Sequence, residues 1–321
     1  MSSKKSKRLI LSICIFVILA VIVILQFTVF NKRGERNFKE ILNPVDYNTI
    51  DRIEYIMPSN NIPAILTKEG NIWKITRNDT TYTADYLLVE NVLRETTKVK
   101  PARIVAVSKD KLEEYDFKDD KTIPVKYFSN GKVVAEYHIG GYEFLSLPST
   151  DPNGRPRDGM FTFIKEPKSD IIYSIWGFLR TFFNSDINLL RNKIIYNINN
   201  NDDILEVVGL FNDESNNFLL VKNADNLWVY NGNIVDDENI NKINTYLQKV
   251  KSQTGIVFYQ DEYSKDNVET ITIKGNNFSP IVLNFYPIEN TKDYVYESNT
   301  YNEGVFYDKN GSQRGRLILE F

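Results

Sequence analysis

The sequence of 321 residues contains one pattern twice, and this repetition constrains the fold more than any other feature. The stretch NIWKITRNDTTYTADYLLVENVL, which begins at Asn71, matches NLWVYNGNIVDDENINKINTYL, which begins at Asn226. Each copy runs from Asn and an apolar residue to Trp, and then through a polar turn into an amphipathic helical pattern. A chain that repeats a long pattern is expected to contain two copies of one folding unit.

The segments around the two copies repeat in the same order. Short alternating runs precede each helical pattern and predict antiparallel strands: IDRIEYIM, AILTKEG and NIWKITR in the first copy, and DILEVVGLF, NFLLVKN and NLWVYNG in the second. A hairpin is expected after each helix, with its turn at Asn130-Gly131 in the first copy. EYDFKDDKTIPVK and EYSKDNVETITIK, which begin at Glu114 and Glu262, align without a gap. We therefore expect Trp73 to superpose on Trp228 and Tyr115 on Tyr263.

These patterns predict an α+β fold in which each module combines antiparallel strands with one packed helix. The first module is expected over residues 41–200 and the second over residues 201–321. In the first helix, Thr83 is placed to cap the N-terminus and Asp85 falls in the first turn. The second helix carries one apolar stripe, formed by Ile240, Ile243, Leu247 and Val250. We further expect a buried helix over IIYSIWGFLRTFF and a last strand, RLILEF.

An apolar run, Leu9–Phe30, lies near the beginning of the chain between basic residues. At roughly 1.5 Å per residue, its length of about 33 Å suffices to cross a bilayer as a helix. No small-x-small cleavage site follows it, which favours an uncleaved single-pass anchor within residues 1–40 over a signal peptide. The basic residues before the run favour a cytoplasmic N-terminus, and therefore an extracytoplasmic body. The sole cysteine, Cys14, lies within this run, so no internal disulfide is possible.

The repeated pattern resembles the uncharacterised-domain family 4340. In the first module the matching positions are Trp73, Thr83, Ala84, Asp85, Leu93, Tyr115, Ile139, Gly140, Tyr173, Leu190, Arg191 and Lys193. The chain departs from the family pattern at Asp116-Phe117, where Gly-Leu is usual, and at Pro287-Ile288, where the second module lacks the Ile-Gly pair. The resemblance implies an anchored extracytoplasmic bacterial protein that works as an auxiliary component of a gliding-motility-type ABC transport system. It implies no biochemical activity.

The inventory of reactive residues argues against several classes of enzyme. His138 is the only histidine, so a Ser-His-Asp triad or a histidine zinc site would have to use it. It falls near the end of a predicted strand, where a half-exposed histidine without a catalytic role is expected. HIGGYEF contains adjacent glycines but no phosphate-binding pattern, and its glycines are expected to serve a tight bend. Trp73 and Trp228 are interpreted as core residues.

Acidic side chains occur in pairs at Glu113-Glu114, Asp119-Asp120, Asp202-Asp203 and Asp236-Asp237. They fall in turns or at helix starts, where carboxylates cap backbone donors, although a glycosidase would need only two of them. The loop STDPNGRPRDGM brings Asp151, Asn153 and Asp158 together, but its spacing is not that of a calcium loop, and Arg155 and Arg157 intervene. A loop that contacts a partner is the preferred interpretation.

We therefore predict a non-enzymatic binding or scaffold protein without catalytic, cofactor-binding or metal-binding residues. Its expected partners are the membrane and subunits of an ABC transport system. The net charge is −3, with +6 in residues 1–40 and therefore −9 in the remainder, and this acidic body without a dense stripe of Lys and Arg argues against nucleic acid as a partner. Two alternatives stay open: a protein that binds cell-wall glycan or another extracytoplasmic ligand in a cleft between the modules, and a carboxylate-dependent hydrolase.

Overall fold

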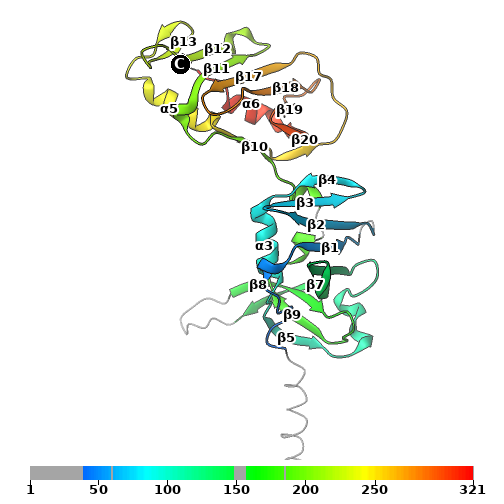
Figure 1. Ribbon diagram of the computed structural model, residues 1–321. Coiled ribbons are helices and arrows are strands. Elements are labelled where there is room, and N and C mark those ends of the chain that lie inside the picture. The colour runs from blue at the N-terminus through cyan, green and yellow to red at the C-terminus, as the bar shows by residue number, and fades with distance from the viewer. Residues whose placement is uncertain (1–38, 59–60, 148–156, 184–185, 321) are drawn as a thin grey trace, which may run out of the picture. The chain divides into compact units, whose positions relative to one another are not determined.

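The computed structural model describes residues 39–58, 61–147, 157–183 and 186–320 (Figure 1). These residues form two compact units. The second unit consists of Thr81–Tyr86 together with the chain from Asp186 onward, and the first unit consists of the other described residues. Each unit is built around one large antiparallel sheet.

The sheet of the first unit has nine strands in the order β4-β3-β2-β1-β6-β7-β8-β9-β5. Their bounds are β1 (Arg52–Ile56), β2 (Pro63–Glu69), β3 (Ile72–Arg77), β4 (Thr80–Thr83), β5 (Pro101–Ala106), β6 (Ile123–Ser129), β7 (Lys132–Leu147), β8 (Arg157–Lys165) and β9 (Ile172–Trp176). Alternating residues of β1, β2 and β3 are buried, which is the pattern of strands with one face on a core.

The sheet of the second unit also has nine strands, in the order β14-β13-β12-β11-β17-β18-β19-β20-β16. Their bounds are β11 (Ile204–Leu210), β12 (Phe218–Lys222), β13 (Trp228–Tyr230), β14 (Asn233–Ile234), β16 (Val257–Tyr259), β17 (Glu269–Gly275), β18 (Ile281–Pro287), β19 (Tyr294–Ser298) and β20 (Tyr301–Asp308). Every strand has a counterpart at the same place in the first sheet, so the two sheets share one topology. A separate two-stranded sheet joins β10 (Ile194–Asn197) to β15 (Ser252–Thr254).

Cross-strand pairs also recur between the two sheets. Glu54 of β1 lies opposite Lys126 of β6, and Glu206 of β11 lies opposite Lys274 of β17. The two tryptophans share one contact, because each is paired with a lysine of the preceding strand. The Lys68 amine lies 5.7 Å from the centre of the Trp73 ring, and the Lys222 amine lies 5.1 Å from that of Trp228.

The expected match of Tyr115 with Tyr263 is not supported by their surroundings. Tyr115 ends a short 3-10 helix, Glu113–Tyr115, and its hydroxyl donates to the Val105 carbonyl at 3.2 Å. The Tyr263 hydroxyl donates instead to the Glu297 carboxylate, and its ring packs among other tyrosines. The two units therefore agree in sheet topology and differ in the loop before the central hairpin.

One helix in each unit packs on the core through an apolar stripe. Helix α3 (Tyr86–Thr96) buries Val89, Val92, Leu93 and Thr96, and helix α5 (Ile240–Val250) buries Ile243, Tyr246, Leu247 and Val250. The predicted stripe of α5 is confirmed, and Ile240 packs against the same core half-buried. The predicted cap of α3 is wrong. The Thr83 hydroxyl donates to Glu303 at 2.6 Å, and the helix begins after Asp85.

Asn-Gly turns close two of the hairpins. Asn130 and Gly131 join β6 to β7 with φ of 50° and 73°, which confirms the predicted turn. Asn231 and Gly232 join β13 to β14 with φ of 46° and 86°. Positive φ at both central residues gives a turn whose twist suits an antiparallel hairpin, and Asn followed by Gly adopts it readily.

The expected tight bend at Gly140-Gly141 would have ended the strand, but the strand does not end there. Strand β7 continues through both residues, and its register against β8 shifts between Ile139 and Tyr142. A Cβ atom on Gly140 would lie 2.4 Å from the carbonyl oxygen of Tyr115, so glycine is required here by a close approach of two backbones.

Two elements differ in type from the prediction. Residues Ile172–Trp176 form strand β9, and only Arg180–Phe183 (α4) is helical, because this run completes the first sheet beside β8. The end of the chain forms no strand over residues 316–320. Helix α6 (Ser312–Arg316) precedes an extended segment in which Leu317 and Leu319 are buried. The carbonyls of these two leucines accept hydrogen bonds from the hydroxyls of Tyr246 and Tyr230, where a strand would need backbone partners.

The prediction of an α+β fold is therefore wrong. Antiparallel strands dominate both units, and the described helices are few and short. The reason is that segments expected to be helix or loop form strands of the two sheets. The prediction that the fold begins with a transmembrane helix is corrected as well. Across residues 39–320, with the gaps stated above, no helix is long and apolar enough to cross a membrane. The run Leu9–Phe30 lies outside the described residues.

Candidate functional site

His138 lies on β7, opposite Lys165 of β8. Burial lowers the pKa of His138, and the positive charge of Lys165 lowers it further. The Lys165 amine is itself held by the backbone carbonyls of Glu166, Pro167 and Ser169, at 3.3, 3.3 and 3.1 Å. Within the described residues, the His138 ring forms no hydrogen bond to a hydroxyl or a carboxylate. Its surroundings are those of a neutral histidine on a sheet.

The paired carboxylates are scattered and mostly engaged locally. Glu113 and Glu114 each form an ion pair with a nearby lysine, Lys118 and Lys111 respectively. Asp203 accepts from the Asn277 side chain at 2.8 Å. Asp236 accepts from the backbone of Asn239 at 2.9 Å, just before helix α5. Carboxylates of this kind stabilise turns and helix starts.

Of the long loop, Asp151, Asn153 and Arg155 lie outside the described residues. Asp158 accepts from the Ser146 hydroxyl at 2.6 Å, between β7 and β8 at the end next to the loop. In the described part of the chain, no group of three or more His, Cys, Asp or Glu side chains is arranged to hold a metal ion.

Arg191 is buried in the second unit. It is one of the positions at which the sequence resembles family 4340. Its guanidinium lies 3.6 Å from the ring centres of both Tyr82 and Phe258. It donates to Asn188 at 2.9 Å and to the carbonyl of Glu303. This residue joins several segments of the second unit and is not directed at solvent.

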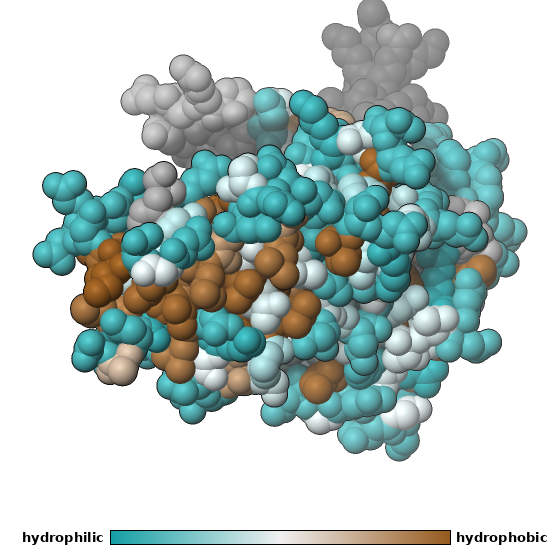
Figure 2. Space-filling view, turned by 90° about the horizontal axis from the view of Figure 1, so that it is seen from above, coloured by the Kyte–Doolittle hydropathy of each residue, from teal (hydrophilic) through white to brown (hydrophobic). Residues whose placement is uncertain are grey.

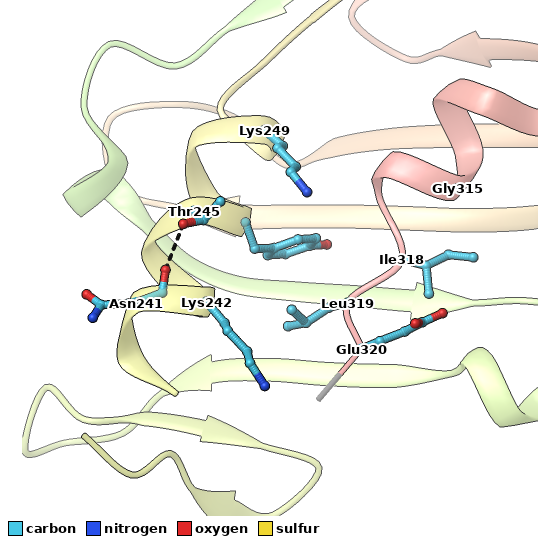
Figure 3. A pocket seen from close by; sticks show the side chains of 9 residues that line it. Asn241, Lys242, Thr245, Lys249, Gly315, Ile318, Leu319 and Glu320 are labelled. Atoms are coloured by element: carbon cyan, nitrogen blue, oxygen red, sulfur yellow. Dashed lines mark hydrogen bonds between the residues drawn. The ribbon is translucent and has the colours of Figure 1, made fainter. Parts of the chain in front are cut away.

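A hollow of about 500 Å³ lies between helix α5 and the chain after α6 (Figure 3). Lys242 and Lys249 come from α5, two turns apart on one face of the helix, and Glu320 belongs to the opposite wall. Leu319 points toward α5, whereas Ile318 points away from it. The hollow is open, and exposed lysines on a helix are typical of a solvated face.

A second hollow of the same unit, about 490 Å³, lies beside strand β16. Its lining combines tyrosine rings, carboxylates and aliphatic side chains: Val257, Phe258, Tyr259, Gln260, Asp261, Ile288, Asp293 and Tyr307. The rings of Tyr259 and Tyr307 are close to parallel, with centres 6.0 Å apart. The Tyr307 hydroxyl donates to Asp293, which also accepts from the backbone of Asn310 at 2.7 Å. These hydrogen bonds, the Tyr307 bond foremost, lower the pKa of Asp293.

An exposed apolar area of the second unit lies on the sheet face opposite the core. Val208 pairs with Leu219, and Val229 pairs with both Val221 and Ile234, so these side chains share one face of the sheet. We name this surface the leucine face; it consists of Val208, Leu210, Leu219, Val221, Val229 and Ile234. Leu210, Leu219 and Ile234 are 55%, 40% and 62% exposed. Figure 2 shows apolar side chains gathered over one area of the molecular surface, with hydrophilic ones along much of its border.

The corresponding face of the first sheet mixes polar and apolar side chains, because Ile56 pairs there with Pro63 and Ile72 is 51% exposed. Glu54 of β1 lies opposite Ile65 of β2, which lies opposite Thr76 of β3. Arg52 likewise lies opposite Thr67, which lies opposite Lys74. Thr67 and Lys74 lie beside the Lys68–Trp73 pair, as Val221 and Val229 lie beside the Lys222–Trp228 pair. The fold therefore does not require apolar residues at these two positions.

The local sequence pattern did not reveal the hollow beside β16 or the leucine face. The hollow is assembled from residues 257–261, 288–293 and 307, which only the sheet order brings together. The leucine face was visible only as unusually apolar strands, such as DILEVVGLF and NFLLVKN, whose outward residues are Val and Leu where Glu, Lys or Thr are usual.

The resemblance to the uncharacterised-domain family 4340 stays a prediction, because no protein-family model, curated protein or solved structure matches the chain.

Proposed function

We propose that this protein is a non-enzymatic binding protein whose second unit docks another protein subunit through the leucine face. The observation that carries the proposal is the exposure of Leu210, Leu219 and Ile234 on one sheet face. Large apolar side chains lose contact with water when a partner covers them, at about 25 cal/mol per Å² of apolar surface. Contiguous exposed apolar patches on folded proteins usually mark such contacts.

The layout of the surface supports a protein partner. An apolar centre with a polar rim is the usual anatomy of a protein–protein interface. Figure 2 shows an apolar area of the surface with hydrophilic residues along much of its border. The first sheet has Thr67 and Lys74 where the second has Val221 and Val229, so the fold itself does not require apolar residues at these two positions.

The partner that we propose follows from the resemblance described above. It is a permease-type or auxiliary subunit of an ABC transport system. The extracytoplasmic location belongs to the same prediction. The alternatives of glycan binding and of a carboxylate-dependent hydrolase stay predictions, and the experiment below also separates them from subunit docking.

The test is affinity purification of the full-length chain from its own cells, followed by identification of the proteins that co-purify. We expect transporter subunits with the native chain, and their loss with Leu219→Asp, because a carboxylate cannot be buried unpaired in an apolar contact. Thr67→Asp is the matched control, since Thr67 lies on the corresponding face of the first sheet. Thermal unfolding of each variant verifies that it is folded.

Retention of the transporter subunits by a folded Leu219→Asp variant would contradict docking through the leucine face. Absence of transporter subunits from the native chain, together with retention of isolated cell-wall glycan, would favour the glycan alternative. Hydrolytic turnover that is abolished by substitution of a single Asp or Glu would favour the enzyme.

A further inference from the structure

Cations of the second unit repeatedly occupy niches built from aromatic rings. Arg191 lies between Tyr82 and Phe258. Arg314 pairs with Glu269, and its guanidinium lies 5.0 Å from the ring centre of Phe211. In each niche, the ring faces attract the positive charge electrostatically.

A third niche of this kind lies on the outer side of the sheet. The Lys265 amine lies 3.0 Å from the Glu297 carboxylate, and 5.7 and 5.5 Å from the ring centres of Tyr263 and Tyr286. Both tyrosine hydroxyls donate to Glu297, at 3.3 and 2.6 Å. The niche thus consists of two tyrosines and one carboxylate, and the chain supplies its own cation.

The hollow beside β16 has the same components without a cation. Tyr259 and Tyr307 supply the rings, and Asp261 and Asp293 supply two carboxylates. No Lys, Arg or His contributes to its lining, and within the described residues neither aspartate forms an ion pair. Lys309 acts on Asp293 only as a minor, longer-range charge. The niche is therefore complementary to a positive group that the second unit does not itself provide.

The hollow also adjoins a sheet edge that is open to pairing. Strand β16 is the last strand of its sheet and pairs only with β20 among the described residues. Val257 of β16 pairs with Tyr307 of β20, and Tyr259 lies two residues further along, so these three side chains share one face. An extended segment added beside β16 would project alternate side chains to that face.

We propose that the hollow beside β16 binds the guanidinium or ammonium group of an Arg or Lys side chain, carried on an extended segment of the partner protein that pairs with the edge of β16. The inference rests on the proposed docking function and specifies the chemistry of a second contact with the same partner. The two tyrosine rings and the two carboxylates recognise the cation, and the backbone of β16 recognises the strand.

Isothermal titration of the full-length protein with short peptides tests the proposal. The probe is acetyl-Thr-Val-Thr-Arg-Thr-Val-Thr-amide, and its matched control carries citrulline, which has the shape of arginine without the charge. We expect the arginine peptide to bind at least about tenfold more tightly, as a desolvated cation on aromatic rings and carboxylates requires. A peptide that is N-methylated at every residue has no backbone donor on either edge, so it cannot pair with a strand and should not bind.

Two protein variants complete the design. Asp261→Asn with Asp293→Asn removes both negative charges from the hollow and should abolish the preference for arginine over citrulline. Asp225→Asn, in the exposed turn between β12 and β13, removes a charge elsewhere in the unit and should leave the preference unchanged. Equal binding of the arginine and citrulline peptides, or an arginine preference that survives in the double variant, would overturn the cation site. Undiminished binding of the N-methylated peptide would overturn strand pairing.

These outcomes are separable from those of the docking experiment. If Leu219→Asp abolishes co-purification of the partner but the peptides show no arginine preference, the cation site is refuted and docking through the leucine face stands. If Leu219→Asp has no effect while the arginine preference is measured, docking through the leucine face is refuted and the hollow retains its assigned chemistry.

Discussion

Arg314 and Glu269 form an ion pair that attaches helix α6 to strand β17 within the second unit. The Glu269 side chain is only 2% exposed, and it also accepts from the backbone of Asn212 at 3.1 Å. The adjacent Asp308 accepts from the backbone of Gln313 and Arg314 at 2.8 and 2.9 Å, and thereby holds the first turns of α6. The end of the chain is thus held by two buried carboxylates.

Arg314→Met should lower the free energy of unfolding by about 3–5 kcal/mol, because it leaves the Glu269 carboxylate buried without its partner. Arg316→Met, on the exposed side of the same helix, is the control and should change stability little. Urea unfolding of the full-length chain provides the measurement. A loss in Arg314→Met no larger than that in the control would show that Glu269 is satisfied without the arginine.

Trp73→Ala should cost about 3–5 kcal/mol of unfolding free energy, because the ring is fully buried in the core of the first unit. Trp176→Ala should cost distinctly less, since that ring is 55% exposed and packs edge-on against Phe161. Denaturant unfolding of both variants tests the comparison. Equal losses would mean that burial of the ring does not determine its contribution.

The pKa of His138 should be measured below its ordinary value of about 6.5, since burial and the charge of Lys165 both disfavour the protonated ring. The unfolded chain then binds this proton more readily than the folded chain. Stability should therefore fall as the pH is lowered through about 6.5 toward the folded-state pKa. As the only histidine, His138 gives a single imidazole signal for titration by NMR. His138→Gln should remove this part of the pH dependence, and a midpoint above 6.5 would contradict the prediction.

Gly140→Ala should destabilise the first unit by about 1–3 kcal/mol, because the added methyl group meets the Tyr115 carbonyl oxygen at 2.4 Å. Gly315→Ala is the matched control. That residue lies in α6 with open space around it, so alanine should be neutral or stabilise by about 0.4–1 kcal/mol. Thermal unfolding separates the two outcomes, and equal effects would refute the close contact.

The features predicted well from the sequence depend on short stretches of chain. The Asn130-Gly131 turn and the α5 stripe are specified by neighbouring residues, and the repeat is specified by the order of its segments. The features predicted poorly depend on distant partners. Residues Ile172–Trp176 are apolar enough for a buried helix, and only pairing with β8 and β5 makes them a strand. Leu317 and Leu319 alternate with other residues as in a strand, but their carbonyl oxygens accept hydrogen bonds from tyrosine hydroxyls and not from a neighbouring strand.

The candidate site was unpredictable for the same reason. Tyr259, Asp293 and Tyr307 are separated by many residues and become neighbours only through the pairing of β16 with β20 and of β20 with β19. No short window of sequence carries this information. The outward valines and leucines of β11 and β12 were visible in the sequence, but their exposure depends on which face the helix covers.

The two sheets share one topology but differ in some of the side chains on their outer faces. Both sheets keep the same strand order and the pairing of Glu54 with Lys126 and of Glu206 with Lys274. Other outward positions differ, because the first sheet has Thr67 and Lys74 where the second has Val221 and Val229. A repeated fold can therefore present a different outer surface on each of its copies. Substitutions at outward positions can change the surface of one unit while its strand order and core stay the same.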